Sequence, residues 1–306
     1  MGKKMNPRYV FLRFPDGKLK AVTFSYDDGV RQDIRLVEIL DKYGLKGTFN
    51  VNTLMFGDGV DSSRLSSEEV KKYIFDKGHE IAIHGANHRA PGKQRAIGVI
   101  RDALDCRLGL EELLGAIIRG MAYPDSGIRN IQVGCADYEK IREILCDLDV
   151  AYSRTLGGDN DGFEIPTDFY AWMPTAHHNN ANIFEYIEKF NAINEDGVYS
   201  ASKTPKLFYL WGHSYEFDSN NNWDRIEKIC EELSGKEDVW YATNIEIYDY
   251  VKAYESLVWS ASGMTVYNPT LIDVWMWCDG NIVKVSTGET VRIENGSYKN
   301  DNRKSN

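Results

Sequence analysis

Acidic and imidazole side chains follow apolar segments of the sequence at positions where they could share one metal ion. Asp27 and Asp28 come directly after the apolar segment 18–24, while His84 ends another apolar segment and is followed by His88. Imidazoles four residues apart lie on one face of a helical turn and can bind a single divalent ion. With one carboxylate they would form a two-histidine, one-carboxylate site that has open positions for water or a substrate.

A third histidine and the second aspartate could supply acid-base chemistry beside such an ion. His213 ends the apolar segment 206–213, so it also stands at the end of a predicted strand. A metal can lower the pKa of its bound water from about 15.7 toward about 7, so a neighbouring carboxylate suffices to take the proton. One aspartate would bind the metal and the other would be the base, and the residues alone do not decide which. The pattern predicts metal-assisted hydrolysis.

Repeated β/α units are expected to position these residues. From Lys20 to about Ser260, short apolar segments alternate with amphipathic segments of helix length, and seven or eight such units close most naturally into a barrel with its chemistry at the carboxyl ends of the strands. The expected strands are 20–26, 46–52, 79–84, 117–123, 150–155, 169–174, 206–213 and 239–243. The expected helices are 33–44, 66–78, 93–114, 135–148, 181–194, 222–233 and 245–254.

The pattern changes near the C-terminus. The segment 260–295 is rich in β-forming residues and contains Asp279-Gly280, a pair typical of two-residue hairpin turns. We therefore expect three parts: a catalytic barrel over 1–259, a small β appendage over 260–295 and a disordered tail over 296–306.

Composition excludes several classes of partner. The chain has 306 residues and a net charge of -10, so nucleic acid and anionic membranes would be repelled, and neutral or cationic small ligands fit better. The five cysteines show no Cys-x-x-Cys spacing, and no segment has the length of a signal peptide or of the roughly 20 apolar residues of a membrane span. A cytoplasmic protein is expected, unless a leader was removed, and the oligomeric state is unknown.

Four motifs, taken in order, resemble those of a known family. They are FSYDDG (24–29), HGANH (84–88), AYPDSG (122–127) and LWGHS (210–214), and the chain resembles the polysaccharide deacetylases, carbohydrate esterase family 4, from about 20 to 254. The resemblance implies an α/β fold, a distorted and incomplete (β/α) barrel of seven or eight units. It also implies removal of acetyl groups from N- or O-acetylated saccharides with one divalent ion, zinc foremost, with cobalt or nickel as alternatives.

The resemblance also assigns roles to the residues at the strand ends. Asp27 would be the general base, and His213 would be the general acid that protonates the leaving group. The metal ligands would be Asp28, His84 and His88.

One family motif departs from the expected pattern. Where many members carry an arginine that pairs with the base, this chain has Ala122, followed by Tyr123, Pro124 and Asp125. Arg119 and Arg154 are the two candidates to replace that arginine. The backbone N–H of Asp125 could still help to hold an oxyanion, because that role needs no particular side chain.

Other polar and aromatic residues are weaker candidates for the substrate pocket. Asp168 could orient His213 or merely begin a strand, and Tyr215 and Glu216 could contact sugar hydroxyls at the rim or lie in a solvated loop. Trp172, Trp211 and His178 could line the pocket. Buried tryptophans in a barrel are commonly core residues, and a histidine in a loop is commonly solvated.

Three other functions stay open on the sequence alone. An amidohydrolase of the same fold could act on a non-sugar amide or imide, because loops retune such barrels. A non-haem iron oxygenase shares the two-histidine, one-carboxylate pattern but has no use for Asp27 and His213. A non-catalytic glycan-binding barrel has no need of both an acid and a base.

Overall fold

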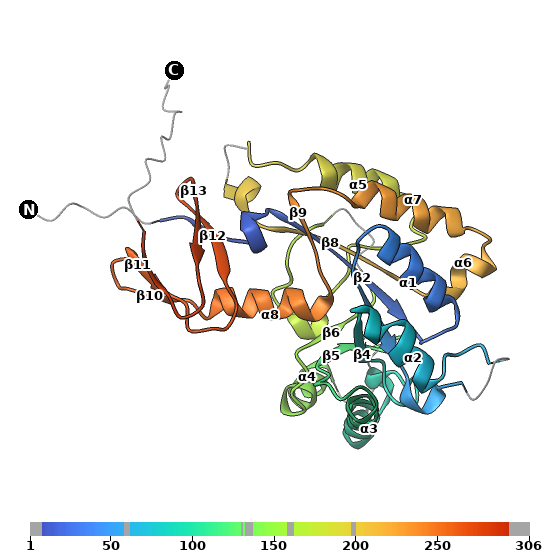
Figure 1. Ribbon diagram of the computed structural model, residues 1–306. Helices are drawn as coiled ribbons and strands as arrows, with labels where there is room; N and C mark the ends of the chain where they lie inside the picture. The colour runs from blue at the N-terminus through green and yellow to red at the C-terminus, as the bar shows by residue number, and fades with distance from the viewer. Residues whose placement is uncertain are drawn as a thin grey trace, which may run out of the picture.

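An eight-stranded parallel sheet forms the centre of the molecule (Figure 1). The structure, a computed structural model, describes residues 8–57, 62–129, 131, 137–157, 162–196 and 200–293. The strand order is β6-β5-β4-β3-β2-β8-β7, and β9 pairs with the first half of β2 while β3 pairs with the second half. The strands are β2 (Lys20–Asp27), β3 (Gly47–Val51), β4 (Glu80–Ile83), β5 (Gly120–Ala122), β6 (Tyr152–Arg154), β7 (Ala176–His177), β8 (Lys206–Gly212) and β9 (Val239–Tyr241). The sheet curls into an incomplete barrel, which confirms the predicted fold class.

Helices lie outside the sheet and follow its strands along the chain (Figure 1). They are α1 (Gln32–Lys42), α2 (Ser67–Tyr73), α3 (Ala96–Leu114), α4 (Tyr138–Asp147), α5 (Ile183–Ala192), α6 (Tyr215–Ser219), α7 (Trp223–Leu233) and α8 (Asn244–Glu255). Short 3-10 helices occur at Pro15–Gly17, Thr53–Met55, Phe75–Lys77, Pro91–Lys93, Phe169–Ala171 and Ser200–Lys203. Within the described residues, none of the helices combines the length and the apolar character that crossing a bilayer requires.

The central strand β2 directs its polar side chains to the interior of the barrel. Phe24 and Tyr26 belong to the main apolar core between sheet and helices. Ser25 instead accepts a hydrogen bond from Asn50 of the adjacent strand β3 (2.9 Å). Because side chains alternate along a strand, Asp27 lies on the same side as Ser25, at the carboxyl end of the strand. The alternation thus brings a carboxylate to the mouth of the barrel.

One expected strand takes a different conformation. The segment 169–174 was predicted as a strand from its aromatic residues, but Phe169–Ala171 form a 3-10 helix, and the strand β7 lies further on. The Asp168 carboxylate accepts a hydrogen bond from the Tyr170 N–H (2.9 Å), which caps the turn. This local side-chain to backbone bond competes with the extended conformation.

A small antiparallel region adjoins α8 (Figure 1). Its strands are β10 (Val258–Trp259), β11 (Thr265–Tyr267), β12 (Val274–Cys278), β13 (Asn281–Val285) and β14 (Thr290–Arg292). Together with β1 (Val10–Arg13) they form the sheets β1-β12-β13 and β10-β11-β14. The predicted hairpin at Asp279-Gly280 is confirmed, because Cys278 pairs with Asn281 across a two-residue turn. The strand β1 (Val10–Arg13) was not predicted, and it joins this region from the other end of the chain. The expected tail 296–306 lies outside the described residues.

Candidate active site and metal centre

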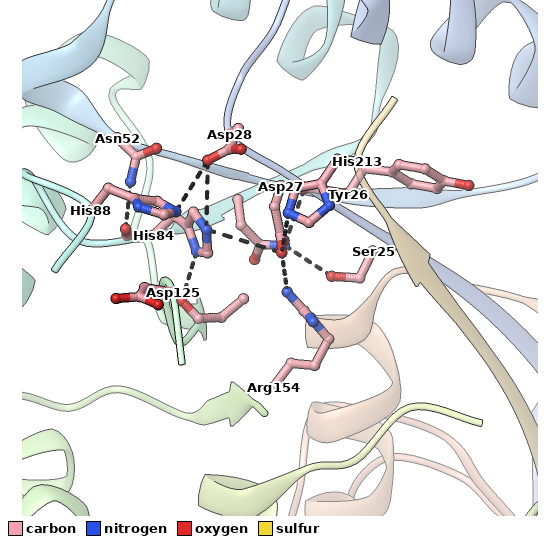
Figure 2. Close-up of polar contacts among 12 residues, drawn as sticks. Ser25, Tyr26, Asp27, Asp28, Asn52, His84, His88, Asp125, Arg154 and His213 are labelled. Carbon is pink, nitrogen blue, oxygen red and sulfur yellow. Dashed lines mark hydrogen bonds and ion pairs between the residues drawn. The ribbon is translucent and has the colours of Figure 1, made fainter. Parts of the chain in front are cut away.

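The ends of three nearby strands bring the candidate catalytic and metal-binding residues to one place. Asp27 and Asp28 stand at the end of β2, His84 follows β4, and His213 follows β8, and these strands are adjacent or separated only by β3. Figure 2 shows the carboxylates and imidazoles pointing toward one common space. The carboxyl ends of parallel strands meet at the same edge of a sheet, which is why segments far apart in the sequence converge here.

Asp28, His84 and His88 form a group that fits a metal ion. The Asp28 Oδ1 atom lies 3.3 Å from His88 Nε2 and 3.9 Å from His84 Nε2, and the three atoms all lie within 4.8 Å of one another. Tetrahedral zinc with ligands at about 2.0–2.1 Å would hold neighbouring ligand atoms about 3.3 Å apart. Among the described residues no group donates a hydrogen bond to the buried Asp28 Oδ1. Because no hydrogen-bond donor of the described part of the chain occupies this oxygen, it can serve as a metal ligand, although Arg64 Nη1 lies 3.4 Å away as a first cationic neighbour.

The imidazole of His84 is held in the tautomer that a metal ligand needs. Its Nδ1 lies 2.9 Å from the carbonyl oxygen of Ala122, and because a carbonyl can only accept, Nδ1 carries the proton. The lone pair of Nε2 therefore points toward Asp28. Burial lowers the pKa of His84, although the neighbouring Asp27 and Asp28 carboxylates oppose this shift. The ring is thus neutral and able to bind a metal.

The backbone around the candidate ligands is strained, and a side-chain hydrogen bond holds part of it in place. Asp28 and His88 have φ values of 86° and 53°, in a region that residues other than glycine seldom adopt. The loop after His84 is held by Asn52, whose amide donates to the carbonyl oxygen of Gly85 (2.9 Å). These contacts fix where the ligand side chains point.

Asp27 occupies a separate position beside the proposed ligands. Its carboxylate pairs with the Arg154 guanidinium and accepts a hydrogen bond from Asn50 Nδ2 (2.9 Å). Its Oδ2 lies 4.0 Å from His84 Nε2 and 3.9 Å from His213 Nε2. Burial would raise the pKa of Asp27, but Arg154 and the two imidazoles more than offset it, so the pKa falls below its ordinary value. The carboxylate is therefore ionised near neutral pH.

Of the two arginines considered from the sequence, Arg154 contacts Asp27. It is the last residue of β6, is fully buried, and lies over the ring of Trp211, with Cζ 4.6 Å from the ring centroid. Arg119 lies at the opposite end of its strand and pairs with Asp249 (2.6 Å). Asp27 is thus paired with an arginine of β6, the strand next to β5 in the sheet.

Glu216 is a residue whose importance the sequence did not reveal. Its carboxylate lies 2.8 Å from His213 Nδ1 and accepts a hydrogen bond from Asn179 Nδ2 (2.7 Å). His177 and His178 approach the same carboxylate at 3.4 and 3.3 Å. The spacing of three residues at the start of α6 is the signal that could have indicated this contact, because such residues share a helix face.

The environment of His213 favours its protonated form. Burial would lower the pKa of this imidazole, but the hydrogen bond to Glu216 and the charges of Asp27 and Asp28 outweigh it, so the pKa is raised. The Nε2 atom, which faces Asp27, can then donate a proton into the common space.

A second group of potential ligands is better explained by hydrogen bonds. His177, His213 and Glu216 also have atoms within 4.8 Å of one another. However, the Asn179 N–H donates to His177 Nδ1 (3.1 Å), so the Nε2 of His177 carries the proton and faces Glu216. The charge of the Glu216 carboxylate is therefore stabilised by side-chain hydrogen bonds and needs no metal ion.

Several other residues proposed for the pocket lie elsewhere. Tyr123 is buried and donates to the carbonyl oxygen of Tyr170 (2.8 Å). Trp172 is buried against Tyr152, Phe169 and Tyr209, and Asp168 caps the turn described above and does not contact His213. The side chains of these three residues belong to the core or to α4 contacts.

The remaining candidates lie nearer the site. Trp211 lies between Arg154 and His213, with its ring centroid 5.8 Å from that of His213. His178 is buried beside Glu216, and burial lowers its pKa to about 4. Pro124 packs near Gly85, and Asp125, with a φ of 53°, lies in the turn after β5. The role of the Asp125 N–H stays a prediction.

A cation that was not predicted also reaches the site. Arg64 lies in the loop before α2, and its Nη1 atom lies 3.4 Å from Asp28 Oδ1 and 3.3 Å from Asn52 Oδ1. The same atom donates to the backbone oxygen of Asp28.

The fold is an incomplete β/α barrel with acidic and imidazole side chains at the carboxyl ends of its strands. Residues 5–135 match the family model described as polysaccharide deacetylase. This is the family that the motifs of the chain resemble, and the match covers the first part of the barrel.

Individual relatives are more distant. A chitin deacetylase of Arthroderma benhamiae is 31% identical over 101 residues, which are 33% of this chain and 25% of that protein, so the match spans a quarter of the relative's length. A Mycobacterium smegmatis protein considered a polysaccharide deacetylase is similar in structure, with a TM-score of 0.52, 17% identity and coverage of 82% of this chain and 96% of that chain. Puue allantoinase has a TM-score of 0.54 at 12% identity and covers 77% of this chain and 91% of its own. At these identities the two structures show a shared fold.

Proposed function

We propose that this protein is a metal-dependent deacetylase that hydrolyses the acetyl group of an N- or O-acetylated saccharide. The observation that carries the proposal is the convergence of a candidate ligand group with a separate carboxylate and a separate imidazole. The family match and the relative described as a chitin deacetylase support the choice of an acetylated sugar. Catalysis is assigned to the barrel, 1–259, and a structural role to the appendage, 260–295.

The candidate ligands would hold one divalent ion. A hard or borderline ion bound by Asp28, His84 and His88 would polarise the acetyl carbonyl and acidify a water molecule. Zinc suits two neutral imidazoles and one carboxylate, and cobalt or nickel could replace it.

Asp27 is assigned as the general base. It is ionised, and Arg154 and Asn50 fix its position. It would accept the proton of the attacking water as the new C–O bond forms.

His213 is assigned as the general acid. It would donate its Nε2 proton to the departing nitrogen or oxygen as the bond to the acetyl carbon breaks. An amide needs this acid more strictly than an ester, because an unprotonated amine is a very poor leaving group.

Replacing Glu216 by glutamine should move the alkaline limb of the pH profile of kcat/KM to lower pH. The carboxylate raises the pKa of His213, so its removal causes the acid form to be lost at lower pH. Asn179→Ala is the matched control, since it removes another partner of Glu216 without changing charge, and its alkaline limb should stay in place. An unshifted profile for Glu216→Gln would show that Glu216 does not control the pKa of the general acid.

An amide or imide that is not a sugar is the second candidate substrate. It is favoured by the structural likeness to a protein described as an allantoinase, although at 12% identity that likeness concerns the fold. A cyclic ureide therefore belongs among the compounds to be assayed.

Removal of the metal should abolish acetate release, and its return should restore it. The measurement is an acetate-release screen over acetylated mono- and oligosaccharides, in amide and ester forms, with chelated protein and with zinc, cobalt or nickel added back. Oxygen-independent acetate release that requires the ion supports the proposal and excludes an oxygenase. Hydrolysis of a cyclic ureide without acetate release would show that the protein is an amidohydrolase. Glycan binding without turnover would show that it is a non-catalytic glycan-binding protein.

A further inference from the structure

We propose that the pocket beside Asp28 binds an oxyanionic group of the substrate through Arg64, so that the preferred substrate is an acidic acetylated saccharide. The inference deepens the proposed function and rests on it. It adds a substrate class and a specificity-determining residue.

The pocket opens directly beside the candidate metal ligands. Its volume is about 340 Å³, and it is lined by Asp28, Val30, Gln32, Ser63, Arg64 and Tyr215. Since Asp28 belongs both to this lining and to the ligand group, a sugar whose acetyl group lay at the centre could extend a second substituent into the pocket.

The loop that carries Arg64 is fixed against the end of β2. Val30 and Arg64 form an isolated β-bridge, and the Leu65 N–H donates to the carbonyl oxygen of Gly29 (2.9 Å). On the other side of this bridge, the Arg31 N–H donates to the carbonyl oxygen of Ser63 (3.1 Å). The position of Arg64 is therefore set by backbone pairing before any substrate arrives.

The guanidinium of Arg64 is anchored through one nitrogen. Its contacts with Asp28 and Asn52 are all made by Nη1, and in the part of the chain that the structure describes no protein group accepts a hydrogen bond from Nη2 or Nε. The side chain is 20% exposed. An arginine offers five donors in a planar fork that suits carboxylate and phosphate oxygens. Because only Nη1 is held by the described residues, Nη2 and Nε can donate hydrogen bonds to a group bound in the pocket.

Local charge also favours an anion. Asp27 is matched by Arg154, Glu216 by protonated His213, and Asp28 by Arg64. Among the described residues these three pairs are balanced, so a divalent ion would add two positive charges to them. One is balanced as negative charge develops on the acetyl oxygen, and an oxyanion of the substrate would balance the other.

The remaining lining suits a sugar ring. Tyr215 is 38% exposed, and its ring centroid lies 5.3 Å from that of His213. An aromatic face beside the proposed general acid can pack against the apolar face of a pyranose, while Gln32 and Ser63 offer polar groups at the rim. The occupant is thus a sugar bearing the anion and not a small inorganic ion alone.

The net charge of -10 does not oppose this inference at short range. Exposed charges are screened beyond about 8 Å at physiological salt, whereas Arg64 would touch the bound group. The expectation from composition, that neutral or cationic ligands fit better, concerns approach from a distance and not the contact itself.

The test compares matched substrates on matched variants. An N-acetylglucosamine oligosaccharide, its C6-carboxylate counterpart and its C6-phosphate counterpart are assayed for acetate release by the wild type, Arg64→Gln, Arg64→Lys and Arg31→Gln. The last variant is the control, because Arg31 lies on the same segment but pairs with Glu69 outside the pocket. Metal content and thermal unfolding are measured for each variant.

We expect the wild type and Arg31→Gln to prefer at least one acidic substrate by about 10- to 100-fold in kcat/KM. Arg64→Gln should lose this preference, because its KM should rise more for the acidic substrate than for the neutral one, and Arg64→Lys should retain part of the preference. The carboxylate and phosphate arms show which oxyanion is preferred. An unchanged preference in Arg64→Gln, or an equal loss on both substrates, would overturn the inference.

A binding measurement separates this inference from the proposed function. Calorimetric titration of the deacetylated acidic and neutral sugars needs no turnover, and the acidic sugar should bind the wild type about tenfold or more tightly than it binds Arg64→Gln. If no acetylated compound is hydrolysed and this difference is still found, the deacetylase assignment fails and the subsite stands. If acetate is released and the difference is absent, the subsite fails and the deacetylase assignment stands.

Discussion

Asp27→Asn should lower kcat/KM for acetate release by about 10²- to 10⁴-fold while the protein keeps its metal ion. Asparagine has nearly the same shape but cannot take up a proton. Asp27 is also separate from the ligand group, with its Oδ2 at 4.0 Å from His84 Nε2. The measurements are steady-state kinetics and metal content by elemental analysis on the same preparation.

The substitution has a structural cost that must be controlled. Arg154 is fully buried, and removal of its partner charge should lower the free energy of unfolding by about 3–5 kcal/mol. The double variant Asp27→Asn, Arg154→Met removes the unpaired charge and should regain stability without regaining activity. Turnover at the parental rate by Asp27→Asn would show that the base is another group, and loss of the metal would make Asp27 a ligand.

His84→Ala should lose both metal and activity, with metal affinity reduced by more than about 100-fold. Removing a direct ligand should cost more than the 10- to 100-fold typical of groups that only orient ligands. The affinity is measured by competition with a chromophoric chelator, and the activity by acetate release at saturating metal.

His177→Ala is the matched control for this experiment. His177 belongs to the second group of potential ligands, around Glu216. The Asn179 N–H donates to His177 Nδ1, so the Nε2 atom that faces Glu216 carries a proton and is not available to a metal ion. This variant should keep its metal affinity within about threefold. Retained metal in His84→Ala together with lost metal in His177→Ala would move the ion to the Glu216 cluster.

The barrel and the strand-end residues could be predicted because they leave local signals. Apolar segments alternating with amphipathic ones indicated the β/α units, and polar residues directly after those segments marked the mouth of the barrel. Asp27, His84 and His213 were found in this way, and the structure brings them together.

Contacts made across the sheet leave no such signal. Both Arg119 and Arg154 lie within predicted strands, and the parallel pairing of β5 with β6 shows that Arg154 stands at the mouth and Arg119 at the other end. Arg64 lies in a loop without periodicity, and its approach to Asp28 depends on the β-bridge with Val30. Such partners follow from the register of the fold.

Local capping explains the main error in the elements. The aromatic segment 169–174 has high strand propensity, but the carboxylate of Asp168 bonds the Tyr170 N–H and turns the chain. Trp172 then packs into the core, which is why it and Asp168 take no place beside His213. Propensity is a weak guide where a side chain competes for the backbone.

The pairing of β1 with β12 has a consequence for synthesis of the chain. Val10 lies opposite Cys278, so β1 cannot pair until β12, which follows the whole barrel in the sequence, has been synthesised. Truncation of the chain after residue 259 would leave the edge of β1 permanently unpaired. An unpaired strand edge can pair with other protein molecules and cause aggregation. Strands β1, β12 and β13 therefore form one unit, although β1 lies far from the other two in the sequence. In a circular permutant that places β1 directly after β13, these strands could pair as soon as they are synthesised.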